Sequence, residues 1–279
     1  MIDSVSAVPS LPVRGSQLHA ERRGSGEPLL LIQGMGANIA HWGEPFLREL
    51  ERDFELILYD HPGTGLSEPM AGELTTPALA EVALALLDVL KIDRAHVLGF
   101  SMGGMVAQEL ALVAPERVAT LTLAATSCGG TQSKPTSPET VQALTTAVLS
   151  GDREHILKVA FGLLFSRRFA ADAANFPPFA EAARIHPAPV TTLLDQRSAL
   201  LAHDAYGRLR GLAVPTLVVH GSEDRLLEAV NGDLIASMVP GARLELLDGV
   251  GHLLFWEQPE RVAQLVREHA AAGAGRSSA

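Results

Sequence analysis

The chain has 279 residues, of which 47% are hydrophobic and 19% are charged, and its formal net charge is −10. This composition is typical of one large globular α/β domain, with or without an inserted lid, and excludes a disordered chain. An acidic surface repels phosphate backbones, so nucleic-acid binding is not expected.

Both ends of the chain have loop-like sequences. Residues 1–12 combine serines and two prolines without an apolar period, and residues 273–279 are small and polar, so we expect both segments to be flexible. No run reaches the roughly 18 apolar residues of a membrane helix, and the first residues lack the pattern of a signal peptide. We therefore expect a cytoplasmic protein without membrane contacts. The single cysteine, Cys128, excludes an internal disulfide and a cysteine-based zinc site.

Short apolar runs rich in β-branched residues predict six strands. Most of them are continuously hydrophobic, as expected for parallel strands covered on both faces. The predicted strands span residues 29–33, 54–60, 95–100, 118–125, 215–221 and 242–248.

Amphipathic patterns between these runs predict helices. They cover residues 75–91, the segment from Ser101 to Pro115, and residues 257–271. Alternating strands and helices predict a mostly parallel central sheet with helices on both faces. The chain is therefore expected to have an α/β fold.

This alternation stops between residues 131 and 210. The segment shows helical patterns at 139–150, 153–165 and 189–203, with the sequence NFPPF between them. About 80 residues is far longer than an ordinary crossover, so we expect a helical lid inserted into a core formed by residues 13–130 and 211–272. The apolar lid surface could face a substrate or a second subunit, which leaves a homo-oligomer possible.

The sequence GFSMGG at 99–104 carries the clearest chemical signal. It matches the G-x-S-x-G pattern between an apolar strand and an amphipathic helix, the context of a nucleophile elbow. A tight turn there exposes the Ser101 hydroxyl, and Gly99 and Gly103 leave room for it. The start of the following helix favours developing negative charge. Ser101 is the candidate nucleophile.

A serine nucleophile needs a base that is oriented by a third group. His252 lies in a glycine-rich loop after the last predicted strand, at the sheet edge where ligands bind in open α/β sheets. Asp224 follows the strand at 215–221 and is the candidate acid, with Glu223 as its neighbouring competitor. The alternative position for an acid, after the strand at 118–125, holds no carboxylate.

The chain resembles α/β-hydrolases of the Ser-Asp-His type over nearly all of residues 13–272. Beside the serine motif, the resemblance rests on LLLIQGMG (29–36), DHPGTGLS (60–67), HGSED (220–224) and GVGHLLFWEQPE (249–260). It implies a catalytic triad of Ser101, Asp224 and His252. It also implies an oxyanion hole formed by the backbone N–H groups of Met35 and Met102.

One position departs from the family pattern. Gln33-Gly34 stands where the family usually has His-Gly. Gln33 either replaces the structural hydrogen bonds of that histidine or contacts a substrate oxygen. Gln33, Gly34, Trp42 and Phe100 are further candidates for substrate contacts, although Trp42 fits a helix-packing role equally well.

These features predict a serine hydrolase that needs no cofactor or metal, since no metal-ligand or nucleotide-binding motif is present. The expected substrate is a small to medium, largely apolar carboxylic ester or lactone, which is cleaved through an acyl-enzyme. Two alternatives stay open. The same triad can cleave C–C bonds or transfer acyl groups, and a receptor-like member of the fold would bind a ligand with little turnover.

Overall fold

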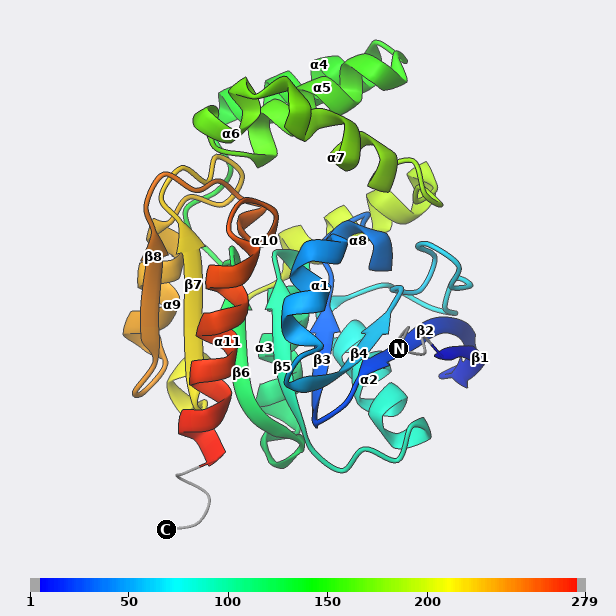
Figure 1. The fold of residues 1–279 in the computed structure, drawn as a ribbon, viewed down its shortest axis with the longest axis vertical. Helices are drawn as coiled ribbons and strands as arrows, with labels where there is room; N and C mark the ends of the chain where they lie inside the picture. Colours follow the sequence, from blue (N-terminus) through cyan, green and yellow to red (C-terminus); the bar gives the residue numbers. More distant parts are fainter. Residues whose placement is uncertain (1–5, 275–279) are drawn as a thin grey trace.

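One eight-stranded sheet runs through the computed structural model, which describes residues 6–274 (Figure 1). The strand order is β1-β2-β4-β3-β5-β6-β7-β8. The strands are β1 (Ser6–Val13), β2 (Ser16–Gly24), β3 (Glu27–Ile32), β4 (Phe54–Tyr59), β5 (Ala95–Phe100), β6 (Val118–Ala124), β7 (Thr216–Gly221) and β8 (Arg243–Leu247). Strands β3 to β8 are parallel, and β1 and β2 add an antiparallel edge.

The six predicted strands correspond to β3–β8, and each end agrees to within two residues. Most of their apolar residues are buried, as a parallel sheet between helices requires, whereas Leu246 on the edge strand β8 is 54% exposed. The predicted α/β fold, with a mostly parallel sheet and helices on both faces, is therefore confirmed.

Residues 6–12, part of the segment expected to be flexible, belong to β1. Strand β1 pairs with β2 around a tight turn at Arg14-Gly15, where both residues have positive φ (44° and 80°). Prolines are tolerated here because β1 is an edge strand. Residues 273 and 274 likewise complete the last helix. The remaining residues of both predicted flexible ends lie outside the described part of the chain.

Two layers of helices cover the sheet. Helices α1, α10 and α11 pack on one face through one apolar cluster, and α2, α3 and α9 pack on the other through a second (Figure 1). The Thr75 hydroxyl caps α2 by accepting the Ala78 N–H at 3.2 Å. The layers comprise α1 (Glu44–Leu50), α2 (Thr76–Val89), α3 (Met102–Val113), α9 (Val230–Met238), α10 (Leu254–Glu257) and α11 (Pro259–Ala274).

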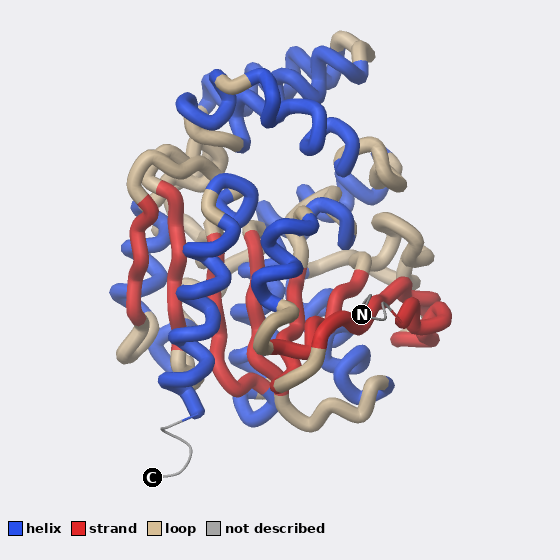
Figure 2. The backbone as a smooth tube through the Cα atoms, viewed as in Figure 1, coloured by secondary structure: helices blue, strands red, loops and turns tan. Residues whose placement is uncertain are grey.

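Five α-helices lie between β6 and β7, in the segment predicted as a lid. Figure 2 shows them above the sheet without any strand among them. They are α4 (Pro138–Leu149), α5 (Arg153–Leu164), α6 (Arg167–Ala171), α7 (Phe176–Ala182) and α8 (Val190–Ala202). The NFPPF segment begins α7 instead of separating helices, because its prolines occupy the first turn, where no N–H is needed.

The lid segment leaves and re-enters the core at one neck. Gly129 and Asp204 form an antiparallel bridge, and the Ala205 N–H donates to the Cys128 carbonyl at 2.8 Å. Ala205 and Leu209 are fully buried in the core cluster of α2 and α3. Apolar packing thus returns the chain to the core at Ala205, a few residues before the expected lid boundary at residue 210.

Candidate active site

The turn between β5 and α3 holds Ser101 in a strained backbone conformation. Ser101 has φ 55° and ψ −121°, a region that non-glycine residues rarely adopt. Two hydrogen bonds fix this turn: the Ser101 N–H donates to the Ala124 carbonyl at 3.0 Å, and the Thr126 hydroxyl donates to the Ser101 carbonyl at 2.6 Å. Such strain persists where the surroundings hold it, and it is common at functional sites.

Glycines on both sides of Ser101 permit the close approach of β5, α3 and β3. A Cβ atom on Gly99 would lie 2.4 Å from the Gly103 carbonyl oxygen, and one on Gly103 would lie 2.1 Å from the Ile32 carbonyl oxygen. Both distances are far below any real contact, so a side chain at either position would displace backbone. The glycines of the predicted elbow therefore have the steric role that the sequence indicated.

His252 and Asp224 meet at the carboxyl edge of the sheet, where both are buried. The Nδ1 atom of His252 lies 2.7 Å from Oδ2 of Asp224. The other carboxylate oxygen of Asp224 accepts the N–H groups of Leu226 and Leu227 at 2.8 and 2.9 Å. This arrangement fixes the carboxylate and leaves the Nε2 atom of His252 for other partners.

A second histidine touches the same carboxylate. Nε2 of His220 lies 2.6 Å from the Leu227 carbonyl oxygen, an acceptor, so this nitrogen carries the proton. It also lies 3.2 Å from Oδ2 of Asp224. Burial opposes ionisation of Asp224, but the nearby His252 and His220 outweigh it and hold the pKa of Asp224 below its ordinary value. Sequence analysis identified Asp224 but not this partner, because the contact depends on the turn after β7.

The loop after β3 lies directly against the serine. A Cβ atom on Gly34 would be 3.2 Å from the Cβ of Ser101. The N–H groups on either side of Met35 are occupied: Gly34 donates to the Gln33 side-chain oxygen at 2.8 Å, and Gly36 donates to the Gln196 side-chain oxygen at 2.7 Å. The backbone N–H of Met35, between them, has no acceptor among the described residues.

The other candidate oxyanion donor, the N–H of Met102, stands at the first position of α3. It too lacks an acceptor within residues 6–274. First-turn N–H groups of a helix have no partner within the helix and attract negative charge. The Met35 side chain is 42% exposed and that of Met102 is buried, but only the backbone groups are needed to bind an oxyanion.

Gln33 takes part in two hydrogen bonds around this loop. Its side-chain oxygen accepts the Gly34 N–H, and its carbonyl accepts a hydrogen bond from Nε2 of His61 at 2.9 Å. The side chain is 1% exposed. Its side-chain nitrogen is buried without a hydrogen-bond partner among the described residues, so both interpretations of Gln33 stay open.

The aromatic candidates lie in a buried cluster beside the histidine. Trp42 is fully buried against Phe46, Phe100 and Phe255, which favours a packing role. The ring of Phe100 is centred 4.8 Å from the His252 ring. Because Phe100 directly precedes Ser101, this contact brings the histidine loop next to the nucleophile elbow.

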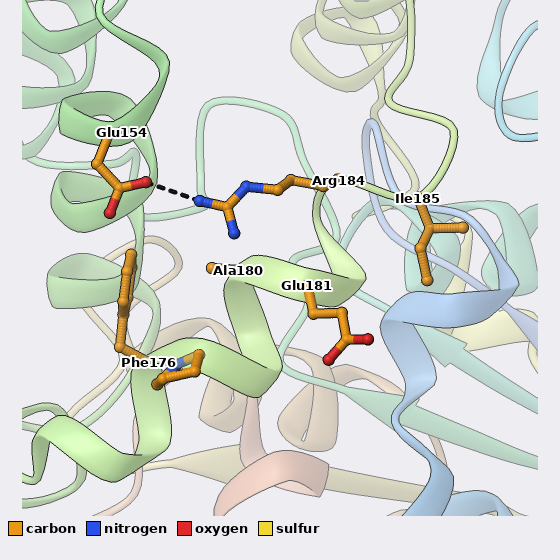
Figure 3. A pocket seen from close by; sticks show the side chains of 7 residues that line it. Glu154, Phe176, Ala180, Glu181, Arg184 and Ile185 are labelled. Atoms are coloured by element: carbon orange, nitrogen blue, oxygen red, sulfur yellow. Dashed lines mark hydrogen bonds and ion pairs between the residues drawn. The ribbon is translucent and has the colours of Figure 1, made fainter.

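Two of the cavities that border the lid lie away from the proposed triad, and a third, of about 560 Å³, is lined by Arg167 and by Asp224 with its neighbours. A cavity of about 590 Å³ lies between α5 and α7 and is lined by Phe176, Ala180 and Ile185, with the Glu154–Arg184 ion pair (2.7 Å) at its side (Figure 3). A second, of about 620 Å³, separates α7 from the loop after β3 and reaches Asp60. None of the three cavities is lined by the serine or by His252.

The sequence that forms this site also matches a known protein family. The model of the alpha/beta hydrolase fold matches residues 27–259. The chain belongs to this family. Within the described part of the chain, no helix is long and apolar enough to cross a membrane, and no cluster of His, Cys, Asp or Glu is arranged to hold a metal ion.

Several members of the alpha/beta hydrolase family resemble the chain along most of its length. A putative carbamate hydrolase RutD from Azorhizobium caulinodans is 31% identical and covers 85% of this chain and 88% of its own. A pimeloyl-[acyl-carrier protein] methyl ester esterase from Aeromonas hydrophila is also 31% identical, over 89% and 97%. The crystal structure of a hydrolase from Pseudomonas aeruginosa PA01 superposes with a TM-score of 0.78 at 30% identity, covering 96% and 98%. These relatives support an enzyme that hydrolyses esters or related bonds.

Proposed function

We propose that the protein is a serine hydrolase in which Ser101, His252 and Asp224 form a catalytic triad. The observation that carries the proposal is the buried Asp224–His252 pair, which packs through Phe100 against the strained turn at Ser101. A serine hydroxyl is a weak nucleophile, so it needs this base, and the carboxylate sets the tautomer of the imidazole.

The first half-reaction forms an acyl-enzyme. The Ser101 hydroxyl oxygen attacks the substrate carbonyl carbon while His252 Nε2 takes the hydroxyl proton. The carbonyl electron pair moves onto oxygen, and the N–H groups of Met35 and Met102 stabilise the oxyanion. When the intermediate collapses, the bond to the leaving oxygen breaks, and that oxygen receives the proton from His252. Asp224 stays ionised throughout, in agreement with its lowered pKa.

The second half-reaction restores the enzyme. Water attacks the acyl carbon as His252 takes one of its protons, and the oxyanion forms at the same two N–H groups. Collapse breaks the bond between the acyl carbon and Ser101, and the serine oxygen receives the proton. The products are a carboxylic acid and the alcohol released earlier; a lactone gives a single hydroxy acid.

We infer a small to medium, largely apolar acyl substrate. The lid presents aromatic residues on the side of the histidine loop, where Phe165 packs edge-on against Trp256 at 6.3 Å and against Phe179 at 5.5 Å. Burial of an apolar acyl group among such side chains contributes favourable binding energy. The methyl ester esterase and the carbamate hydrolase among the relatives both have names that imply attack on an acyl carbon bonded to oxygen.

The decisive experiment is labelling with a fluorophosphonate, followed by intact mass and peptide mapping. We expect one adduct, on Ser101, and we expect Ser101→Ala to abolish both the adduct and hydrolysis in a panel of short-chain esters, lactones and carbamates. A folded Ser101→Ala variant with unchanged turnover would refute the proposal. Labelling without turnover on the panel would favour C–C bond or acyl-transfer chemistry, and ligand binding without labelling would favour a receptor-like protein.

A further inference from the structure

The junction between α5 and α6, residues 162–167, contacts both loops that carry the proposed acid and base. We call these residues the lid corner. On the histidine side, the Leu253 N–H donates to the Leu164 carbonyl at 3.0 Å. A Cβ atom on Gly251 would lie 2.5 Å from the backbone nitrogen of Ser166, so the two backbones are in direct contact. The lid corner therefore touches the residues on either side of His252.

Glu257, at the end of α10, joins the same two segments through its carboxylate. One oxygen accepts the Gly251 N–H at 2.9 Å and the Ser166 N–H at 2.8 Å, and the other accepts the Ser166 hydroxyl at 2.5 Å. Hydrogen bonds to an ionised acceptor are about twice as strong as neutral ones. A single side chain thus ties the backbone next to His252 to the lid corner.

The loop that contains Asp224 is also joined to the lid corner by hydrogen bonds. The Arg167 N–H donates to the side chain of Glu223 at 3.0 Å. The guanidinium of Arg225 donates to the carbonyls of Gly162 and Phe165, the latter at 3.1 Å. Glu223 and Arg225 are the immediate neighbours of Asp224. Both members of the acid–base pair are therefore flanked, on each side, by residues bonded to the lid corner or to Glu257.

We propose that the lid corner positions the His252–Asp224 pair and that Glu257 is the positioning residue that connects it to His252. The inference rests on the proposed function, in which His252 is the base. The histidine loop contains Gly249 and Gly251 and forms no regular ladder, so external bonds must restrict it. A displacement of about 1 Å at a catalytic group can cost about 10²-fold in rate. This side of the lid is thus a fixed part of the active site during turnover.

The test compares Glu257→Leu, which removes all three acceptor contacts, with Glu257→Gln, which keeps an acceptor oxygen for Gly251 and Ser166. We expect Glu257→Leu to lower kcat about 10- to 100-fold with KM changed less than threefold. Glu257→Gln is expected to retain kcat within about threefold. Glu260→Leu is the matched control, since Glu260 is an exposed carboxylate one turn further on. The control is expected to behave like the unmodified protein.

A spectroscopic readout separates positioning from general destabilisation. The proton between His252 Nδ1 and Asp224 gives a strongly downfield proton NMR signal when the pair is well aligned. We expect this signal to shift or broaden in Glu257→Leu and to persist in Glu257→Gln. If Glu257→Leu does not fold, Arg225→Met tests the same idea on the acid side, where it removes two bonds to the lid corner. Arg225→Met is expected to lower kcat at least fivefold and to shift the same signal.

Unchanged kcat and an unchanged downfield signal in a folded Glu257→Leu variant would overturn the inference, as would the same result in Arg225→Met. These failures are distinct from failure of the proposed function. That function fails if Ser101→Ala keeps full activity, whatever the Glu257 variants show. The NMR signal reports on the Asp224–His252 pair even if Ser101 proves to have no catalytic role.

Discussion

Gln196 and Gly36 are 160 positions apart in the chain, yet the Gln196 side-chain oxygen accepts the Gly36 N–H at 2.7 Å. Gln196 belongs to α8 of the lid, and Gly36 to the loop that holds the proposed oxyanion donor. Leu193 packs on Gly36 one turn earlier in the same helix, and Thr192 packs on Gly63. Helix α8 is thereby fixed to the loop that carries the N–H of Met35.

We predict that Gln196→Leu lowers kcat about tenfold and leaves KM within about threefold. Loss of the acceptor frees Gly36 to turn, which misaligns the N–H of Met35 in the transition state, where removal of a donor altogether costs about 10²–10³. Steady-state kinetics on the best substrate of the panel would measure the effect. The control is Arg197→Leu, an exposed neighbour on α8. If kcat fell equally in Gln196→Leu and Arg197→Leu, the cause would be disturbance of helix α8 and not loss of the bond to Gly36.

Asp224→Asn is expected to lower kcat by about 10³- to 10⁴-fold with little change in the fold, because an amide NH₂ at this position favours the wrong imidazole tautomer. Glu223→Gln is the control, since it keeps an acceptor for the Arg167 N–H. It should retain activity within about threefold. A larger loss in Glu223→Gln than in Asp224→Asn would reassign the acid to Glu223.

Gly103→Ala should destabilise the protein by about 3 kcal/mol or more, since the new methyl group would meet two backbone oxygens, of Ile32 at 2.1 Å and of Gln33 at 2.5 Å. Denaturant unfolding measures this loss. Gly162→Ala is the matched control because a Cβ atom there meets nothing within 4 Å. As Gly162 lies in a helix, the control should gain about 0.5–1 kcal/mol. Equal stabilities of the two variants would contradict the close packing at the elbow.

The free energy of unfolding should decrease as the pH is lowered from about 6.5 to about 4. Burial lowers the pKa of His41, His61 and His269 to about 4, whereas each takes up a proton near pH 6.5 once unfolded. In this window the unfolded chain binds more protons, so stability falls as the pH falls. His61→Gln should reduce the slope of the unfolding free energy by about 1.4 kcal/mol per pH unit.

The control for this slope is His155→Gln. His155 is exposed on α5, so this variant controls for the loss of a histidine at the surface. Unfolding measured by fluorescence at several pH values gives both slopes. A slope in His61→Gln equal to that of the unmodified protein would show that His61 is not kept neutral by burial.

The sequence predicted those strands and turns whose conformation depends on residues close together in the chain. Strands β3–β8 are continuous apolar runs, and the glycines around Ser101 identify a sharp turn whatever surrounds it. Strand β2 escaped prediction because its sequence, SQLHAERRG, first alternates buried and polar residues and then ends in partly buried charged ones, so it contains no continuous apolar run. Strand β1 escaped because of its prolines.

The contacts that organise the site have no local signature. Gln196 and Glu257 are an ordinary glutamine and glutamate in helical sequences. The partner of Gln196 lies 160 positions away, and Glu257 joins Gly251, six positions away, to Ser166, 91 positions away. Only the fold shows that their oxygens meet backbone N–H groups beside Met35 and His252. The contact between His220 and Asp224 could not be predicted either, because it depends on the conformation of the turn after β7.

The bridge between Gly129 and Asp204 makes the lid an exchangeable module by topology, because its two ends leave the core as neighbours. A short linker could close the core without it, and lids of other lengths could be grafted there. Yet α8 is bonded to Gly36, and the lid corner is bonded to Leu253, to Glu257 and to both neighbours of Asp224. A grafted lid would therefore have to supply the same acceptors and donors, the side-chain oxygen of Gln196 and the backbone groups of the lid corner among them. Lids of different sequence are therefore restricted little at the neck between Gly129 and Asp204. They are restricted more at the Gln196–Gly36 contact and at the lid corner, where the lid supports the core.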